Sequence, residues 1–196
     1  MAKSGETQMI VKPSAEGVMA SAAAAVKQRG PAPVHLWNPP FCGDLDLRIA
    51  RDGTWFYQGT PIGRPEMVRL FSTILKREDG KYFLVTPVEK VGIEVDDAPF
   101  VAVDFETEGS GRDRRVTFVT QVGDTVTADP DHPLRVARAE DGEPSPYVLV
   151  RGGLEALIDR KSFYRLAEIG EHHEDWFGLW SGGAFFPMIP SAELPA

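Results

Sequence analysis

Hydrophobic and polar residues alternate strictly over residues 44–50, with the period of two that is typical of a half-buried β-strand. The apolar positions of the stretch 44–50 share one face, and they are Leu45, Leu47 and Ile49. The stretch 54–58 is rich in aromatic and β-branched residues, and Gly53 stands in the turn between the two stretches. We therefore predict a β-hairpin in which Gly53 adopts a positive φ.

A helical period of apolar residues follows between residues 65 and 77. Its stripe occupies positions i, i+3, i+4, i+7 and i+8, which are Met67, Leu70, Phe71, Ile74 and Leu75. Because Pro65 suits the first helical position, we predict a helix over 65–77. The alanine-rich stretch 15–28 predicts another helix, capped by Ser14, and residues 161–169 predict a third.

Short strands are predicted wherever an apolar or alternating stretch is bounded by turn residues. These stretches are residues 82–85, 91–95, 100–105, 116–122, 134–139, 147–150 and 176–180. Most of them follow hairpin-like turns rather than helices, which favours antiparallel pairing. We therefore predict an α+β fold with mostly antiparallel sheets, and not a doubly wound parallel sheet.

An internal repeat relates residues 62–86 to residues 158–182 at a constant offset of 96 positions. Six positions are identical, and both copies read as strand, bend, helix, turn and strand. The alternative is a chance likeness between two amphipathic helices. We predict two small domains, 1–97 and 98–196, that share a strand–helix–strand motif. Arg64 and Arg160 would then occupy equivalent places at two helix starts.

The composition is that of an ordinary globular protein, with 42% hydrophobic and 26% charged residues. It excludes the collagen-like, disordered and membrane classes. The 21 basic and 29 acidic residues give a net charge of −8, so we expect no nucleic-acid partner. The alanine-rich stretch 20–26 lacks the basic cluster of a signal peptide, and we expect no membrane association. The single cysteine, Cys42, fits a reducing compartment, so we expect a cytoplasmic protein.

Two clusters could carry catalytic or metal chemistry. Cys42 lies in the same irregular loop as His35, so a nucleophile with a histidine base is one interpretation. The other is a small cysteine at a strand start beside a packed histidine. Residues 172–175 are four adjacent metal-ligand types, but adjacent side chains point in different directions, and we predict a solvated helix end there. We predict no catalytic residues, no metal site and no cofactor.

A ligand site is the other chemistry that the sequence suggests. His35, Trp37 and Cys42 share a proline-rich loop that could meet the segment carrying Glu89 and Lys90 and wall a pocket with it. Arginines at two helix starts could hold an anion, although a structural ion pair is the alternative. The candidate ligand-binding residues are therefore His35, Trp37, Cys42, Arg64, Glu89, Lys90 and Arg160. The site would lie between that loop and segment, or in the cleft between the two domains.

Several of these runs together resemble one uncharacterised bacterial family, domain of unknown function 1285. The runs that carry the resemblance are 34–44, 52–62, Arg64 with Met67, Leu70 and Phe71, 82–90 and 157–166. The resemblance spans nearly the whole chain after residue 30. It implies an α+β protein of two domains with related motifs, and a role in signal transduction or ligand binding. It implies no reaction and no catalytic residues.

The sequence therefore favours a non-enzymatic, cytoplasmic ligand-binding or regulatory module, and the resemblance implies a role for it in signal transduction. One alternative is a hydrolase-type enzyme that uses Cys42 and His35. Another is a protein-interaction or assembly subunit, with an aromatic surface around residues 176–186. The identity of the small molecule or protein partner, and the oligomeric state, do not follow from the sequence.

Overall fold

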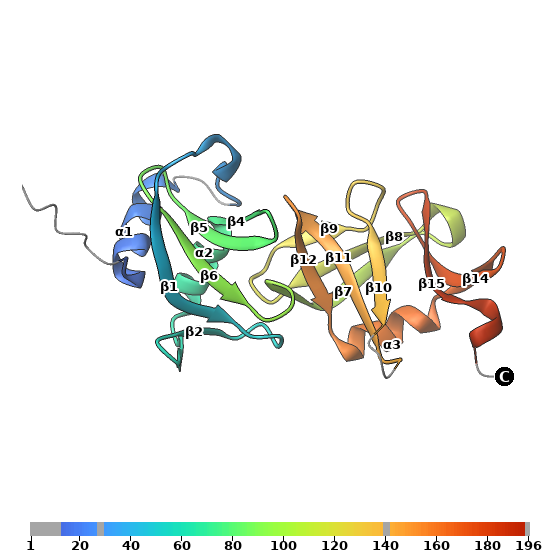
Figure 1. Ribbon diagram of the computed structural model, residues 1–196. Coiled ribbons are helices and arrows are strands. Elements are labelled where there is room, and N and C mark those ends of the chain that lie inside the picture. Colours follow the sequence, from blue (N-terminus) through green and yellow to red (C-terminus); the bar gives the residue numbers. More distant parts are fainter. Residues whose placement is uncertain (1–12, 27–29, 139–141, 195–196) are drawn as a thin grey trace, which may run out of the picture.

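The fold consists of two six-stranded mixed sheets, a three-stranded antiparallel sheet and three α-helices (Figure 1). The computed structural model describes residues 13–26, 30–138 and 142–194, and the counts refer to these residues. The N-terminal domain, the C-terminal domain and the small sheet follow one another along the molecule. The predicted α+β fold with two domains and mostly antiparallel sheets is confirmed. The division at residues 97 and 98 stays a prediction.

The N-terminal sheet has the strand order β3-β2-β1-β6-β5-β4, with β1 and β6 parallel and the other pairs antiparallel. Its strands are β1 (Phe41–Ile49), β2 (Trp55–Tyr57), β3 (Thr60–Pro61), β4 (Leu75–Glu78), β5 (Lys81–Val85) and β6 (Lys90–Val95). The predicted hairpin is formed by β1 and β2, and Gly53 between them has a φ of 85°. Leu45, Leu47 and Ile49 are buried, as their alternation predicts.

Helix α1 (Ala15–Ala25) contacts α2 (Pro65–Thr73) in this domain. The Ser14 hydroxyl accepts a hydrogen bond from the Gly17 amide at 3.1 Å, which is the predicted N-cap. The helix ends at Ala25, short of the predicted end at residue 28, which lies outside the described residues.

The prediction that the second helix runs to residue 77 is wrong, because α2 ends at Thr73 and β4 begins at Leu75. Ile74 and Leu75 are buried as the apolar stripe requires, but Leu75 pairs with Leu84 of β5. Two adjacent apolar residues fit the end of a helical stripe and the start of a buried strand equally well.

The C-terminal sheet has the order β10-β11-β12-β7-β8-β9, with β12 and β7 as its parallel pair. Its strands are β7 (Phe100–Glu108), β8 (Arg115–Thr120), β9 (Thr125–Thr127), β10 (Leu134–Arg138), β11 (Pro144–Arg151) and β12 (Leu154–Ile158). The two sheets have the same strand order. β1 to β6 of the N-terminal sheet correspond in turn to β7 to β12 of the C-terminal sheet. In both sheets the first and the sixth strand of the domain pair in parallel at the centre.

The predicted strand–helix–strand order recurs after β12, where α3 (Arg160–Glu168) is followed by β13 (Glu171–His173). The predicted equivalence of the two arginines is wrong by one position. Arg64 is the N-cap of α2, whereas Arg160 is the first residue of α3. The reason is that the Asp159 carboxylate caps α3 by accepting the Ser162 amide at 2.8 Å.

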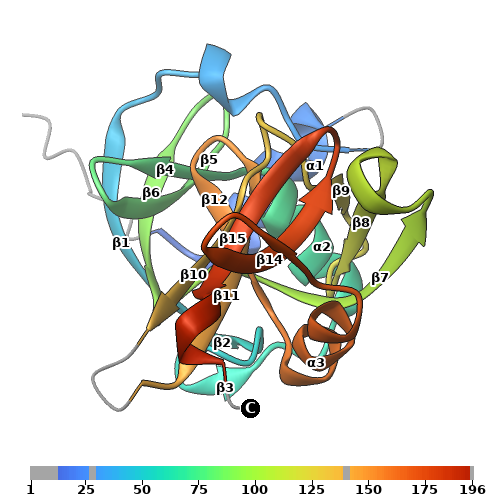
Figure 2. The same ribbon diagram turned by 90° about the vertical axis from the view of Figure 1, so that its right-hand side faces the viewer.

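The small sheet consists of β13, β14 (Trp176–Ser181) and β15 (Ala184–Pro190). It lies against the C-terminal sheet at the end of the molecule, as the view in Figure 2 shows. The buried Ser181 hydroxyl joins the two sheets, since it donates to the Ala128 carbonyl at 2.6 Å and accepts from the Val116 amide at 2.9 Å. The prediction of a solvated helix end at 172–175 is wrong, because His172 and His173 belong to β13.

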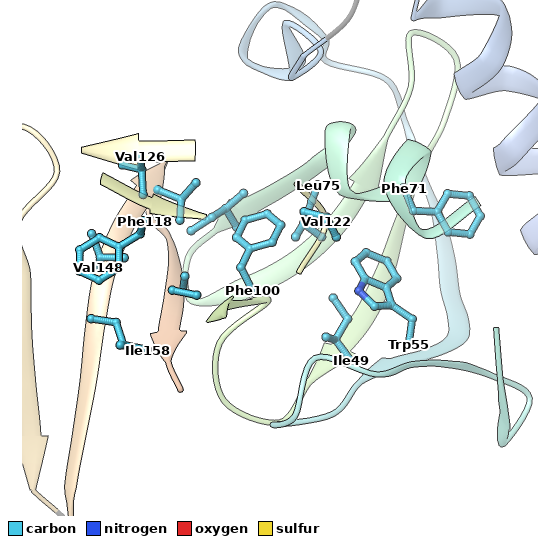
Figure 3. Close-up of a cluster of buried hydrophobic side chains, with 14 of the residues drawn as sticks. Ile49, Trp55, Phe71, Leu75, Phe100, Phe118, Val122, Val126, Val148 and Ile158 are labelled. Atoms are coloured by element: carbon cyan, nitrogen blue, oxygen red, sulfur yellow. The ribbon is translucent and has the colours of Figure 1, made fainter. Parts of the chain in front are cut away.

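One continuous apolar core runs through both domains. Phe100, at the start of β7, is fully buried and lies between side chains of the two domains (Figure 3). Arg151 of β11 reinforces the junction, because its guanidinium bonds Asp124 at 2.6 Å and the Ser72 carbonyl of α2 at 2.8 Å. An apolar interface of this kind holds two domains in a fixed relation.

Candidate functional site

The structure brings the proline-rich loop against the segment 86–90. The Lys90 amide donates to the Pro40 carbonyl at 3.1 Å, and Phe41 pairs with Lys90 in the parallel ladder of β1 and β6. The buried hydroxyl of Thr86 shapes the turn by accepting the Glu89 amide at 3.2 Å. Large apolar side chains are exposed along these two segments, and they are Leu36, Phe41 and Val88.

The polar candidates in this region are engaged with the fold or point to solvent. The Cys42 thiol donates to the Pro40 carbonyl at 3.4 Å and is half-buried. His35 is exposed, and no hydrogen bond joins these two described side chains. Trp37 is half-buried against the core, and the Glu89 side chain is half-buried at the turn. A cysteine–histidine pair of the catalytic kind is therefore not assembled between these two residues.

Lys90 belongs to an ion-pair cluster. Its ammonium lies 2.9 Å from the Glu78 carboxylate and 5.0 Å from the centre of the Phe83 ring. Lys76 binds the same carboxylate at 2.7 Å. Hydrogen bonds from Lys76 and then from Lys90 hold the pKa of Glu78 below its ordinary value.

The lowered pKa of Glu78 predicts a pH-dependent contribution to stability. The contribution is present above the ordinary carboxyl pKa and is lost as the pH falls through the folded-state value. We expect Glu78→Gln to lower the free energy of unfolding by at most about 1 kcal/mol at pH 7, since the pair lies near the surface. In urea titrations the difference should shrink as the pH falls below the ordinary carboxyl pKa. Glu89→Gln, which changes the net charge equally without breaking an ion pair of the described residues, is the control.

The two arginine candidates lie in different domains and are not brought together. The Arg64 guanidinium is exposed and donates to the Met67 sulfur at 3.2 Å. Arg160 donates to the Tyr164 hydroxyl one turn further along α3, at 3.1 Å. This hydrogen bond raises the pKa of Arg160 above its ordinary value.

Arg160 lines a cavity of about 250 Å³ where the two domains meet, which we call the junction cavity. Its lining residues are Arg51, Glu143, Pro144, Pro146, Leu157, Ile158, Asp159, Arg160, Phe163 and Tyr164. Arg51 comes from the turn after β1 in the N-terminal domain, and the others come from β11, β12, α3 and the segment before β11. The cavity thus combines two guanidinium groups, two carboxylates and an apolar wall.

Arg51 is held in place across the domain junction. Its guanidinium donates to the Ser145 hydroxyl at 2.8 Å, and its Nε lies 3.5 Å from the Asp97 carboxylate. The Tyr147 hydroxyl donates to the same carboxylate at 2.8 Å. Burial and then this hydrogen bond raise the pKa of Tyr147 above its ordinary value. These bonds tie Arg51 to Ser145 of the C-terminal domain and to Asp97 of its own domain, beside the cavity that it lines.

Sequence reasoning names Arg160 as a candidate but not Arg51, Asp159 or Tyr164, which line the same cavity. The stretch 51–53 carried only a turn signal, and nothing in it indicated that an arginine would reach the other domain. Within the described parts of the chain, no group of three or more His, Cys, Asp or Glu residues could hold a metal ion. None of the described helices has the length and apolar character that a membrane span requires.

Two family models match the chain. One, described as "Domain of unknown function (DUF1285), N-terminal domain", covers residues 32–98. The other, described as "Protein of unknown function (DUF1285), C-terminal domain", covers residues 99–188. A search of curated protein sequences gives no match.

Two solved structures are similar to this one. A DUF1285 family protein from Silicibacter pomeroyi DSS-3 is 66% identical, with a TM-score of 0.85 over 90% of this chain and 97% of that one. A DUF1285 family protein from Shewanella baltica OS155 is 31% identical, with a TM-score of 0.52 over 63% of this chain and 91% of that one. The chain therefore belongs to the DUF1285 family, with both its N-terminal and its C-terminal domain.

Proposed function

We propose that the chain is a non-enzymatic binding module for a small organic molecule that carries a carboxylate or a similar anionic group. The site is the junction cavity. The observation that carries the proposal is that Arg51 of one domain and Arg160 of the other line the same cavity. Guanidinium groups bind planar anions through paired hydrogen bonds, and both arginines retain exposed surface from which to do so.

The position of the cavity also supports a regulatory role. A ligand that touches both domains contributes its binding free energy to their interface, which is the physical basis of a response to the ligand. The signalling role that the family resemblance implies agrees with this proposal. The apolar wall of prolines, Leu157 and Phe163 would hold the uncharged part of the ligand.

We expect carboxylate compounds with a small apolar body to raise the melting temperature of the protein. A ligand at ten times its Kd stabilises a protein by about 1.4 kcal/mol, since it binds the folded state alone. For a chain of this length that is a shift of roughly 3–6 °C. The measurement is differential scanning fluorimetry with a panel that includes 3-phenylpropionate, free amino acids and the neutral 3-phenyl-1-propanol.

Arg160→Gln should abolish this shift, because it removes one guanidinium from the cavity while leaving α3 a good helix former at that position. The matched control is Arg115→Gln, which removes the same charge from an exposed arginine outside the junction cavity. If no carboxylate compound shifts the wild-type transition, or if Arg160→Gln responds as strongly as the control, the proposal is wrong.

A further inference from the structure

The lining of the junction cavity carries charges of both signs. Arg51 and Arg160 are cations, whereas Asp159 and Glu143 are carboxylates in the same wall. A ligand with only a negative charge would meet the attraction of the arginines and the repulsion of the two carboxylates. A ligand with only a positive charge would meet the reverse. Such a lining discriminates against a singly charged ligand of either sign.

The positively and the negatively charged side chains of the cavity are held by different contacts within the protein. Asp159 is fixed because one of its oxygens accepts the Ser162 amide as the N-cap of α3, and that cap uses only one of its two oxygens. Arg160 is fixed from the next position by the Tyr164 hydroxyl. Arg51 is fixed by Ser145 and Asp97. Since Asp159, Arg160 and Arg51 are each held by contacts within the protein, a charge of each sign is positioned before a ligand arrives, which lowers the entropic cost of binding.

The size and the apolar wall restrict the ligand further. A volume of about 250 Å³ lies below the roughly 300–1,000 Å³ of pockets that hold drug-sized compounds. The remaining lining consists of Pro144, Pro146, Leu157, Ile158 and the aromatic rings of Phe163 and Tyr164. A compound that fills this space has a short charged end and a compact apolar body.

We infer that the junction cavity binds a free α-amino acid with an apolar side chain. The carboxylate would lie against Arg51 and Arg160, the ammonium against Asp159 and Glu143, and the side chain against the prolines and Phe163. The inference rests on the proposed function and deepens it, because it names the class of ligand. The zwitterion is the compound whose two charges complement both pairs of side chains at once.

Three probes of nearly equal size separate the contributions of the two charges. L-phenylalanine carries both, 3-phenylpropionate lacks the ammonium, and 2-phenylethylamine lacks the carboxylate. We expect isothermal titration calorimetry at pH 7 to give a Kd for L-phenylalanine at least ten times lower than for either other probe. A tenfold difference corresponds to about 1.4 kcal/mol, close to the lower end of the roughly 1.5–3 kcal/mol that one hydrogen bond to a charged group contributes.

Asp159→Asn tests the assignment of the ammonium site without removing the helix cap, because asparagine caps helices as well as aspartate does. We expect the variant to bind L-phenylalanine about ten times more weakly and 3-phenylpropionate at least as tightly as the wild type. A variant that had merely lost structure would weaken both. Glu143→Gln gives a second, independent measurement of the same kind.

The outcomes distinguish this inference from the proposed function. If 3-phenylpropionate binds as tightly as L-phenylalanine, the amino-acid inference is overturned and the anion-binding function stands. If Asp159→Asn weakens both probes equally, the placement of the ammonium is overturned. If the wild-type protein binds neither carboxylate probe, both proposals fall together.

Discussion

Replacing Phe100 by alanine should destabilise the protein by about 3–5 kcal/mol, the cost of deleting a fully buried aromatic ring and leaving a cavity. The ring lies between the two domains, and the Arg151 guanidinium covers it at 5.0 Å from the ring centre. For a chain of this length, the change should lower the melting temperature by roughly 6–20 °C. Differential scanning calorimetry and urea titration measure both quantities.

The same variant tests whether the two domains unfold together. Because the buried side chains of both domains form one cluster, we expect a single transition that moves as a whole. Val103→Thr is the matched control, since Val103 lies on the same strand but is 40% exposed, and it should change stability by no more than about 0.5 kcal/mol. Two separate transitions, of which only one moves, would contradict the shared core.

The parts of the fold that the sequence predicts well are those in which local pattern and tertiary packing agree. The β1–β2 hairpin is one, because its alternation, its turn glycine and its buried face all favour the same structure. The start of α2 is another, since Pro65 and the apolar stripe coincide. At Leu75 the local pattern allowed a helix, but this residue pairs with Leu84 of β5 and begins a strand.

Near the C-terminus the sequence predicts β14 of the small sheet, as a strand over 176–180, but not its two partners β13 and β15. β13 reads as a polar run of charged residues and histidines, and β15 contains two prolines, which oppose a strand assignment. These strands exist because they pair with β14 and because the small sheet covers the C-terminal sheet. This pairing depends on tertiary structure, and the local sequence pattern of each strand does not predict it.

The residues of the candidate site also divide into those that the local sequence indicates and those that only tertiary contacts bring to the site. Arg160 could be predicted because it opens a helix within a repeat, and the meeting of the proline-rich loop with the segment 86–90 was also foreseeable. Arg51 could not, since its place at the cavity depends on a hydrogen bond to Ser145 of the other domain. A cavity between domains is assembled from residues distant in sequence, so single-sequence patterns locate only part of it.

Substituting alanine for Gly182 should cost roughly 2–5 kcal/mol and loosen the small sheet. Gly182 has a φ of 55°, a conformation that costs a residue with a Cβ about 1–2 kcal/mol. Its Cβ would also lie 2.9 Å from the Ala128 carbonyl oxygen and 2.7 Å from the Asp129 Cβ, and overpacking of this kind adds about 1–3 kcal/mol. Urea titration measures the loss, and hydrogen exchange of the β14 amides measures the local opening.

Gly183→Ala provides the control that separates these two causes. Gly183 stands next to Gly182 in the same turn with a φ of 79°, but apart from its two chain neighbours no described residue has a heavy atom within 4 Å of the position its Cβ would take. It should therefore show only the conformational cost of about 1–2 kcal/mol, with β14 protected as in the wild type. Equal losses in the two variants would mean that the backbone of Ala128 moves aside and that the contact does not hold the small sheet. A larger loss for Gly182→Ala would establish that the sheet is held by close backbone approach as well as by the Ser181 hydrogen bonds.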